Sequence, residues 1–266
     1  MSVVMGPTHA MSGAAVGLAV AQLLPEQWGG VSTVQETFLY AGLAAGAALL
    51  PDLDSPQATV SRSFGPISQF LSRTVENTAQ GFVNFTRAKK DPKCRNGHRT
   101  LTHTVWFALA TGVAATALIG TYGKPAVIGL LFVLLGLALR GLLPEWSKKA
   151  DWLVLTAVSA ALAYGAWYFI PSDSFGLVLG SAVAVGCLTH IVGDMATKQG
   201  VPILAPLIYF RGKRWGKFQL PKFLSITAGG AGDKLLLTAF SALVVAQISL
   251  LASGDIAALL TELTGR

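Results

Sequence analysis

Seven long apolar segments alternate with polar connectors along this chain of 266 residues. Most of them approach the roughly 20 residues that an α-helix needs to cross a hydrocarbon core of about 30 Å. The pattern therefore predicts an all-α integral membrane bundle of about seven transmembrane helices. The segments cover residues 9–25, 34–51, 101–120, 125–143, 152–170, 175–193 and 234–252.

The connector between residues 55 and 100 has a helical pattern of its own. Its apolar residues recur at helical spacing, and polar residues take the other positions. The apolar positions are Ile67, Leu71, Val75, Thr78, Phe82 and Phe85. We expect an amphipathic helix that lies on the membrane or covers a site; packing on the protein's own core has equal weight. No internal repeat divides the chain, so a single domain over residues 1–266 is expected.

Composition supports the membrane interpretation, because 52% of the residues are hydrophobic and only 12% are charged, against about 25% charged in soluble domains. The net charge of +7 would suit nucleic acid. However, eight of the twenty Lys and Arg residues lie in 52–100, seven in 193–234 and three in 140–149. If all seven segments span, these eighteen share one side, which the positive-inside rule makes cytoplasmic. Anionic lipid then explains the charge, and we expect no nucleic-acid partner.

All four histidines lie in polar clusters at the ends of apolar segments. The clusters are His9 at the start of the first segment, Asp52 and Asp54 after the second, His98 and His103 around the start of the third, and His190 and Asp194 at the end of the sixth. Counting passes through the membrane places all of them on the side assigned to the cytoplasm. Because ionisable residues are costly in a membrane, such clusters are candidates for function.

Imidazole and carboxylate without cysteine form a ligand set for zinc, manganese or non-haem iron. The sequence therefore predicts a site for one or two divalent ions, with zinc as the first choice and manganese or iron as alternatives. The expected ligands are His9, Asp52, His98, His103, His190 and Asp194. Asp54 is expected to act as a base or to orient a histidine. The guanidinium of Arg99 suits a phosphate or an oxyanion.

Each of these assignments has a plainer alternative. His190 and Asp194 are four residues apart on one helix face and could form a structural hydrogen bond or a proton relay. The Asp-x-Asp sequence could be turn chemistry, and Arg99 could be a positive-inside anchor. His98 and His103 converge only if His98 lies in a loop and His103 in the first helical turn, with Thr100 or Thr102 as the cap. Thr8 is the expected cap of the first helix.

Four short stretches, taken together, resemble a known family. They are Thr8-His9, Leu50-Pro51-Asp52-Leu53-Asp54-x-Pro56, Gly97-His98-Arg99-x-x-Thr102-His103-Thr104 and Leu188-Thr189-His190-x-x-x-Asp194. In order and spacing they are similar to the YdjM-like family of membrane-bound, metal-dependent hydrolases, over about residues 8–206. The resemblance implies a multi-pass hydrolase in the bacterial plasma (inner) membrane, with the site facing the cytoplasm. This chain has Ser55 where many relatives carry His.

We therefore expect a metal-dependent hydrolase that cleaves a phosphoester or other ester of a lipid or amphiphile at the cytoplasmic face. The phosphoester follows by analogy, because the His-x-x-x-Asp helix is similar to that of zinc-dependent phospholipase C. Membrane lipid is the expected partner, and the oligomeric state is left open. The alternatives are an ion- or metal-coupled transporter that uses the same residues, and a non-catalytic membrane scaffold.

Overall fold

The computed structural model describes residues 5–24, 31, 33–169 and 176–254, and the regular elements in this part of the chain are helices, without a β-strand. The expected all-α membrane fold is confirmed. The α-helices are α1 (Gly6–Leu23), α2 (Val34–Ala47), α3 (Gly65–Thr86), α4 (Val105–Tyr122), α5 (Lys124–Leu142), α6 (Pro144–Lys149), α7 (Trp152–Phe169), α8 (Gly176–Met195) and α9 (Ala231–Ser253). The 3-10 turns are η2 (Pro51–Asp54), η3 (Val60–Arg62) and η4 (Leu101–His103).

Each of the seven predicted apolar segments overlaps one α-helix, with ends that differ by a few residues. Four of the described helices, α4, α5, α8 and α9, are long and apolar enough to cross a membrane. The other three, α1, α2 and α7, are apolar but fall short in length or hydropathy. Seven spans therefore stay a prediction, while a helical membrane protein with at least four candidate spans is established.

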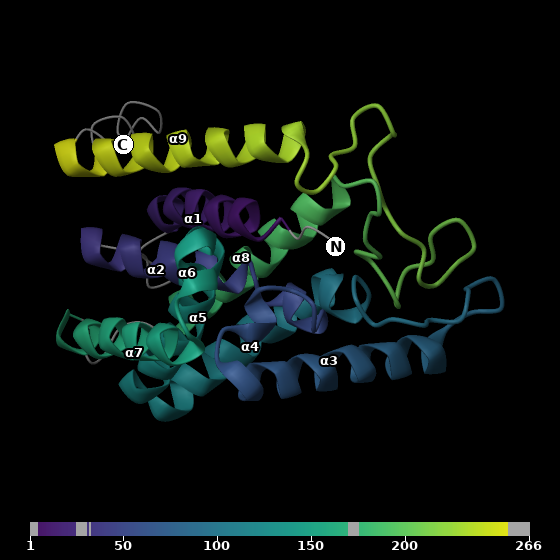
Figure 1. Cartoon of the computed structure of the whole chain (residues 1–266), viewed down its shortest axis with the longest axis horizontal. Helices are drawn as coiled ribbons and strands as arrows, with labels where there is room; N and C mark the ends of the chain where they lie inside the picture. The colour runs from purple at the N-terminus through teal and green to yellow at the C-terminus, as the bar shows by residue number, and fades with distance from the viewer. Residues whose placement is uncertain (1–4, 25–30, 32, 170–175, 255–266) are drawn as a thin grey trace.

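The helices pack around α2 and α8 (Figure 1). α2 contacts α1, α5 and α8, while α4 packs along α8, α7 along α5, and α9 along α1. Two of these crossings depend on glycine. A Cβ on Gly46 would lie 2.0 Å from the carbonyl oxygen of Leu134, and one on Gly13 would lie 2.7 Å from that of Ala44. Such small residues allow close backbone approach between membrane helices.

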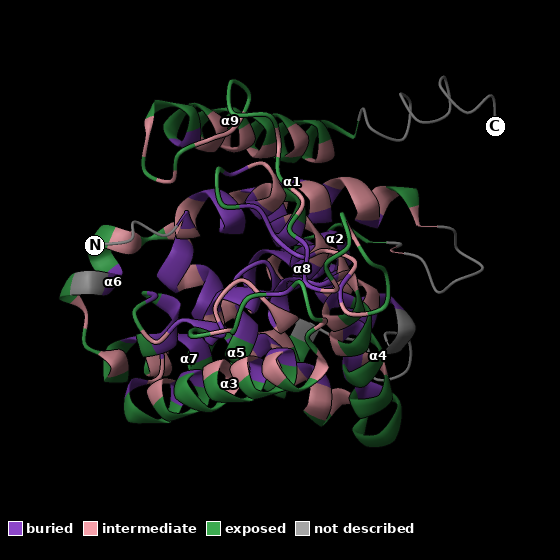
Figure 2. Ribbon diagram, turned by 90° about the vertical axis from the view of Figure 1, so that its right-hand side faces the viewer, coloured by how far each residue is buried: buried purple, intermediate pink, exposed green. Residues whose placement is uncertain are grey.

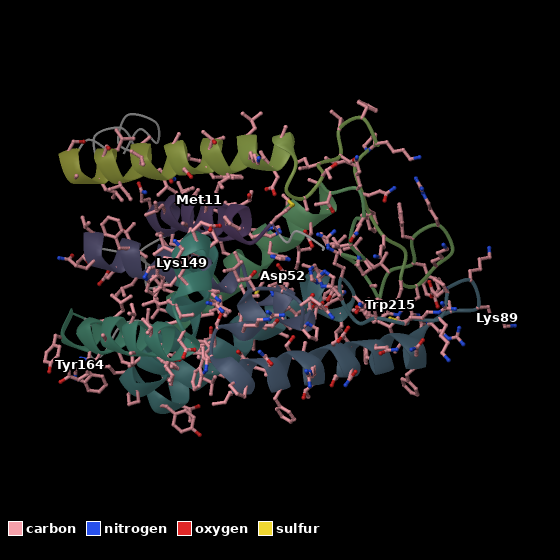
Figure 3. The ribbon with its side chains drawn as sticks, viewed as in Figure 1. Met11, Asp52, Lys89, Lys149, Tyr164 and Trp215 are labelled. Carbon is pink, nitrogen blue, oxygen red and sulfur yellow. The ribbon has the colours of Figure 1, made fainter. Side chains whose placement is uncertain are left out.

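Burial differs between the middle and the outside of the bundle. Buried residues gather around α8 in the middle, and exposed residues run along the outer sides of α9 and α3 (Figure 2). Large apolar side chains on the outer helices are exposed, among them Val113 and Leu235, as expected of a surface in contact with lipid. In Figure 3, Asp52 lies near the centre, Lys89 and Trp215 toward one end, and Tyr164 at the opposite end.

α3 is the amphipathic helix predicted in the long connector. Its exposed apolar residues include Ile67 and Phe85, which are 75% and 89% accessible. Small residues such as Ser72 and Ala79 pack inward instead. Packing of the apolar face on the protein's own core is therefore the wrong alternative.

The start of α1 differs in one respect from the prediction. The helix begins at Gly6, with Pro7 in its first turn and Met5 at the cap position. Thr8 lies inside the helix, and its hydroxyl donates to Asp233 Oδ1 of α9 at 2.5 Å. Thr8 as the cap is therefore wrong, although His9 does lie in the first turn.

Candidate metal centre

The four polar clusters meet at one end of the bundle. His9 comes from the start of α1, Asp52 from η2 after α2, His103 from η4, and His190 and Asp194 from the last turns of α8. All five are buried, with at most 2% of their surface exposed. Their ligand atoms come together because the ends of α1, α2, α4 and α8 are adjacent.

Local sequence explains where the ligand-bearing turns begin and end. Pro51 starts the η2 turn after α2. Thr104 is extended and caps α4, with its hydroxyl accepting from the Phe107 N–H. Thr104 therefore takes the role that was expected of Thr100 or Thr102. Because α4 begins only at Val105, His103 lies in η4 rather than in the first α-helical turn.

Nitrogen and oxygen atoms that could bind a metal converge at the floor of this site. His103 Nε2 lies 3.1 Å from His190 Nε2, and Asp194 Oδ2 lies 3.2 and 3.6 Å from these two nitrogens. His9 Nε2 is 3.3 Å from Asp194 Oδ1, and Asp52 Oδ1 is 3.8 Å from His190 Nε2. Three imidazoles and two carboxylates thus share a small volume.

A backbone carbonyl fixes which nitrogen of His190 faces this floor. His190 Nδ1 lies 2.7 Å from the carbonyl oxygen of Ala48. Because a carbonyl can only accept, Nδ1 must carry the proton. The lone pair of Nε2 in neutral His190 is then directed at the site, which is the form that binds metal.

Asp54 lies behind the histidines and orients two of them. Its Oδ1 is 2.6 Å from His98 Nδ1. Its Oδ2 accepts from the Thr102 hydroxyl and, at 3.1 Å, from the Arg99 N–H, and it lies 3.4 Å from His103 Nδ1. Since both oxygens of this buried carboxylate are occupied, its contacts match the orienting role better than that of a base.

Burial and charge act against each other on these groups. Burial disfavours the charged form of His103, but Asp54 and Asp194 outweigh it and raise the pKa of His103 to about 9. Burial likewise opposes ionisation of Asp54, yet His103 and His98 hold the pKa of that carboxyl well below its ordinary value. In the metal-free protein, a proton on His103 therefore supplies positive charge among the carboxylates.

Arg99 closes the site on another side. Its Nη2 donates to Asp194 Oδ1 at 2.6 Å and its Nη1 to the Thr197 hydroxyl at 2.8 Å. Its buried Nε has no partner. The residue adopts a positive φ of 56°, which is uncommon outside glycine and turns. These contacts show that Arg99 is more than a surface anchor, because they hold its guanidinium beside Asp194.

The donor set fits a divalent metal. Two groups have ligand atoms within 4.8 Å of one another: His9, His190 and Asp194, and Asp52, His98 and His103. Moreover, Asp52 Oδ2 is buried without a hydrogen-bond partner, while Asp194 Oδ2 has the ring nitrogens of His103 and His190 near it. An unpaired buried carboxylate oxygen is costly, and a cation bound by Asp52 would remove that cost. Binding of a metal ion is thus compatible with the geometry, without identifying the metal.

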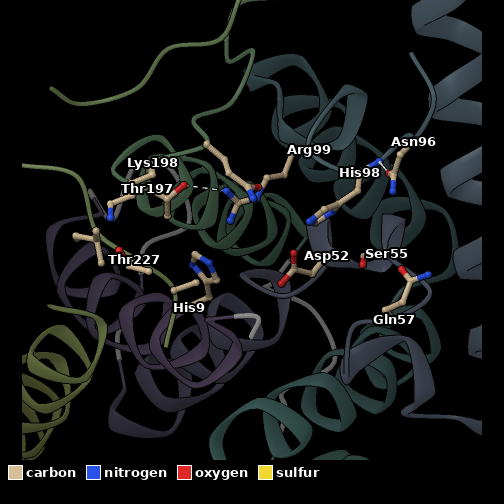
Figure 4. A pocket seen from close by; sticks show the side chains of 13 residues that line it. His9, Asp52, Ser55, Gln57, Asn96, His98, Arg99, Thr197, Lys198 and Thr227 are labelled. Atoms are coloured by element: carbon tan, nitrogen blue, oxygen red, sulfur yellow. Dashed lines mark hydrogen bonds between the residues drawn. The ribbon is translucent and has the colours of Figure 1, made fainter. Parts of the chain in front are cut away.

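A polar cavity of about 610 Å³ opens above this floor. Figure 4 shows His9, Asp52, His98 and Arg99 around it, on the inner side of the opening. Its rim carries polar residues that the sequence analysis did not single out: Gln57, Asn96, Lys198, Gln199 and Thr227. The first four lie within a few residues of predicted site residues, and that proximity was the available signal.

Comparison with known proteins assigns the family. A family model described as YdjM inner membrane protein matches residues 4–143 and 152–255. The chain belongs to this family. No match was found among curated proteins or among solved structures. The YdjM description supports the membrane location and names no activity.

All eight residues predicted for the site lie together in the structure. His9, Asp52, His98, His103, His190 and Asp194 line its floor or walls, while Asp54 and Arg99 hold them from behind and from the side. Their catalytic and ligand roles stay predictions. Ser55 lines the cavity together with Asp52 and His98.

Proposed function

We propose that this YdjM-family protein is a membrane-bound hydrolase that uses one or two divalent ions, with zinc as the first choice, to cleave a phosphoester or other ester of an amphiphile. One observation carries the proposal. Ligand nitrogens of three histidines and oxygens of two buried carboxylates, Asp52 and Asp194, converge at the floor of a polar cavity that Arg99 also lines. Such a floor suits metal-assisted hydrolysis.

The protein's own residues would divide the work as follows. His9, His190 and Asp194 form one ligand set, and Asp52, His98 and His103 form the other. A bound divalent ion supplies a Lewis acid and lowers the pKa of water toward about 7. Asp54 keeps the Nδ1 proton on His98, which directs the other ring nitrogen of His98 toward the cavity.

Arg99 favours an anionic substrate. Its Nη atoms are already bound to Asp194 and Thr197, so the guanidinium is held in place before substrate arrives. The Arg99 side chain lines the cavity, so its positive charge lies beside a substrate there, and Lys198 at the rim adds a second positive charge. Guanidinium groups suit phosphate oxygens, and a fixed donor costs little reorganisation during reaction. A phosphoester is therefore the preferred substrate class.

We place the site on the cytoplasmic side because most Lys and Arg residues lie in the connectors that carry it. Cysteine labelling tests this orientation. In a background without the native cysteines (Cys94→Ser, Cys187→Ala), an impermeant maleimide should label Lys90→Cys in inverted vesicles and leave Tyr122→Cys unlabelled. The reverse pattern would place the site outside.

Metal analysis and a substrate screen test the function. The detergent-purified wild type should retain metal and hydrolyse one or more members of a panel of phospholipids and chromogenic phosphodiesters. His190→Gln should lose both properties. Cys187→Ala is a matched control, because Cys187 is buried one turn earlier on α8 and donates to the carbonyl of Ala47. Wild type without metal, together with unchanged hydrolysis by His190→Gln, would refute the proposal.

The transporter alternative receives less support from the structure. Glu36 and Arg140, charged residues within the apolar segments, both have local structural roles. Glu36 completes a capping box with Thr33 at the start of α2. Arg140 donates to carbonyls of Thr59, Arg62 and Ser147 near the end of α5. Neither residue provides a step of an ion path.

A further inference from the structure

The outward face of α3 is apolar although its inward face is small and polar. Its exposed residues include a set that we call the α3 stripe: Ile67, Phe70, Leu71, Phe82 and Phe85. The residues buried against the protein are Gly65, Ser68, Ser72, Ala79 and Val83. A helix on the surface of a soluble protein normally shows the opposite arrangement. The stripe therefore requires an apolar environment outside the protein.

A third side of α3 is polar and holds the loop that leads into the metal centre. Asn84 Nδ2 donates to the carbonyl of Cys94 at 2.9 Å, and the Cys94 N–H donates to Asn84 Oδ1 at 2.9 Å. A Cβ on Gly97 would lie 2.1 Å from the carbonyl oxygen of Glu76. One edge of the helix thus carries polar loop contacts. The α3 stripe on the other edge makes one ring contact, between Phe82 and Trp215, and otherwise faces outward.

The position of α3 matches that of an interfacial helix. It packs on η2, η3 and η4, the short turns at the ends of the long helices. Its first residue, Gly65, lies against the ring of Trp152 at the start of α7. In Figures 1 and 2, α3 runs along the edge of the molecule with its outer side uncovered. Leu153 and Val154, which follow Trp152, are exposed as well, so apolar surface of α7 lies close to the start of α3.

The end of α3 is firmly attached and basic. Arg214 Nη1 donates to the carbonyl of Thr86 at 2.9 Å, and Trp215 Nε1 to the Thr86 hydroxyl at 3.1 Å. Just beyond it, Lys89 and Lys90 are exposed. Positive charge beside an apolar stripe is typical of helices that bind anionic membrane surfaces.

We infer that α3 lies in the membrane interface, with the α3 stripe inserted into an anionic lipid leaflet and its polar edge in water. Lipid is a better occupant than a partner protein, because the stripe continues an apolar surface that membrane helices already expose and has basic residues at its end. This inference goes beyond hydrolysis and does not depend on it. α3 would hold η2, η4 and the His98 loop at a fixed height above the lipid.

Two exposed positions on α3 provide a matched test. Leu71 and Arg73 are two residues apart, so they point about 160° away from each other on a helix. Each is changed to cysteine in full-length protein lacking the native cysteines (Cys94→Ser, Cys187→Ala) and labelled with a nitroxide. The protein is reconstituted in vesicles of phosphatidylcholine and phosphatidylglycerol, and collisions with oxygen and with a water-soluble nickel chelate are measured. Phe85→Cys repeats the test at the other end of the stripe.

The labels at Leu71 and Phe85 should meet oxygen in preference to nickel, with an oxygen-to-nickel ratio several-fold above that at Arg73. Equal, high access of nickel to the two faces would overturn the inference. Exclusion of both reagents from the stripe, with spin–spin broadening between copies, would also overturn it, because a second protein copy would then cover the stripe.

Discussion

Asp54→Asn tests the orienting carboxylate with a nearly isosteric change. The new amide has two orientations, and both disturb the ligands. If its NH₂ faces His98, the His98 Nδ1 must accept, so the proton moves to Nε2 and that nitrogen cannot bind metal. If its NH₂ faces the other way, it opposes the donors of Thr102 and Arg99, which now bind Oδ2.

The expected loss follows from these contacts. Removing a group that orients metal-binding histidines typically lowers metal affinity by about 10- to 100-fold, which corresponds to about 1.4–2.7 kcal/mol. A hydrogen bond to a charged group contributes a similar amount, about 1.5–3 kcal/mol. We therefore expect Asp54→Asn to bind zinc about 10- to 100-fold more weakly than wild type while remaining folded.

A competition titration against a chromophoric chelator, with detergent-purified protein, measures this affinity. Asp91→Asn is the control, because Asp91 is also buried and accepts from the N–H groups of Ala88, Arg214 and Trp215, away from the centre. The control should lose stability and keep its zinc affinity. If Asp54→Asn binds zinc as tightly as wild type, the orienting role is wrong.

Three further changes test other parts of the site. Arg99→Lys, compared with wild type when both are saturated with zinc, should bind inorganic phosphate about 10- to 100-fold more weakly; equal calorimetric affinity would contradict the assigned anion contact. Gly97→Ala should lower the thermal unfolding midpoint, by overpacking of about 1–3 kcal/mol against Glu76, whereas Gly81→Ala, which meets no atom within 4 Å, should not. The pKa of His103 is raised from 6.5 to about 9 in the folded protein. Protonated His103 therefore stabilises the metal-free protein fully below pH 6.5, and this stabilisation is lost as the pH rises through about 9. The unfolding midpoint of chelated protein should fall over that range, and less in His103→Gln; identical slopes would refute the assignment.

The helices and the convergence of the clusters were predictable from local information. Apolar runs of about 20 residues specify membrane helices, and the order of crossings brings His9, Asp52, His103 and His190 to one end. The observed helix ends differ from the predicted ones by a few residues where a local contact determines them, as at Thr104, which caps α4. The number of spans was less predictable, because α2 has only 14 residues.

Distinctions that depend on distant partners were not predictable. From sequence spacing alone, Asp52 and Asp54 could each bind the metal or orient a histidine. Only the fold, which brings His98 and Thr102 to Asp54, leaves Asp52 Oδ2 unpaired and Asp54 fully bonded. Similarly, periodicity located the apolar stripe of α3 but could not show that Ser72 would face the protein.

The contribution of α8 to the centre has a consequence for biosynthesis. His9, Asp52, His98 and His103 all precede residue 104, whereas His190 and Asp194 follow more than 80 residues later, near the end of α8. During synthesis, the earlier ligands would enter the membrane as an incomplete set. The complete centre can form only after α8 has inserted beside α2 and α4. A chain that stops before α8 would lack His190 and Asp194 of the first ligand set but would keep the whole second set, Asp52, His98 and His103, so only the first set would capture metal late.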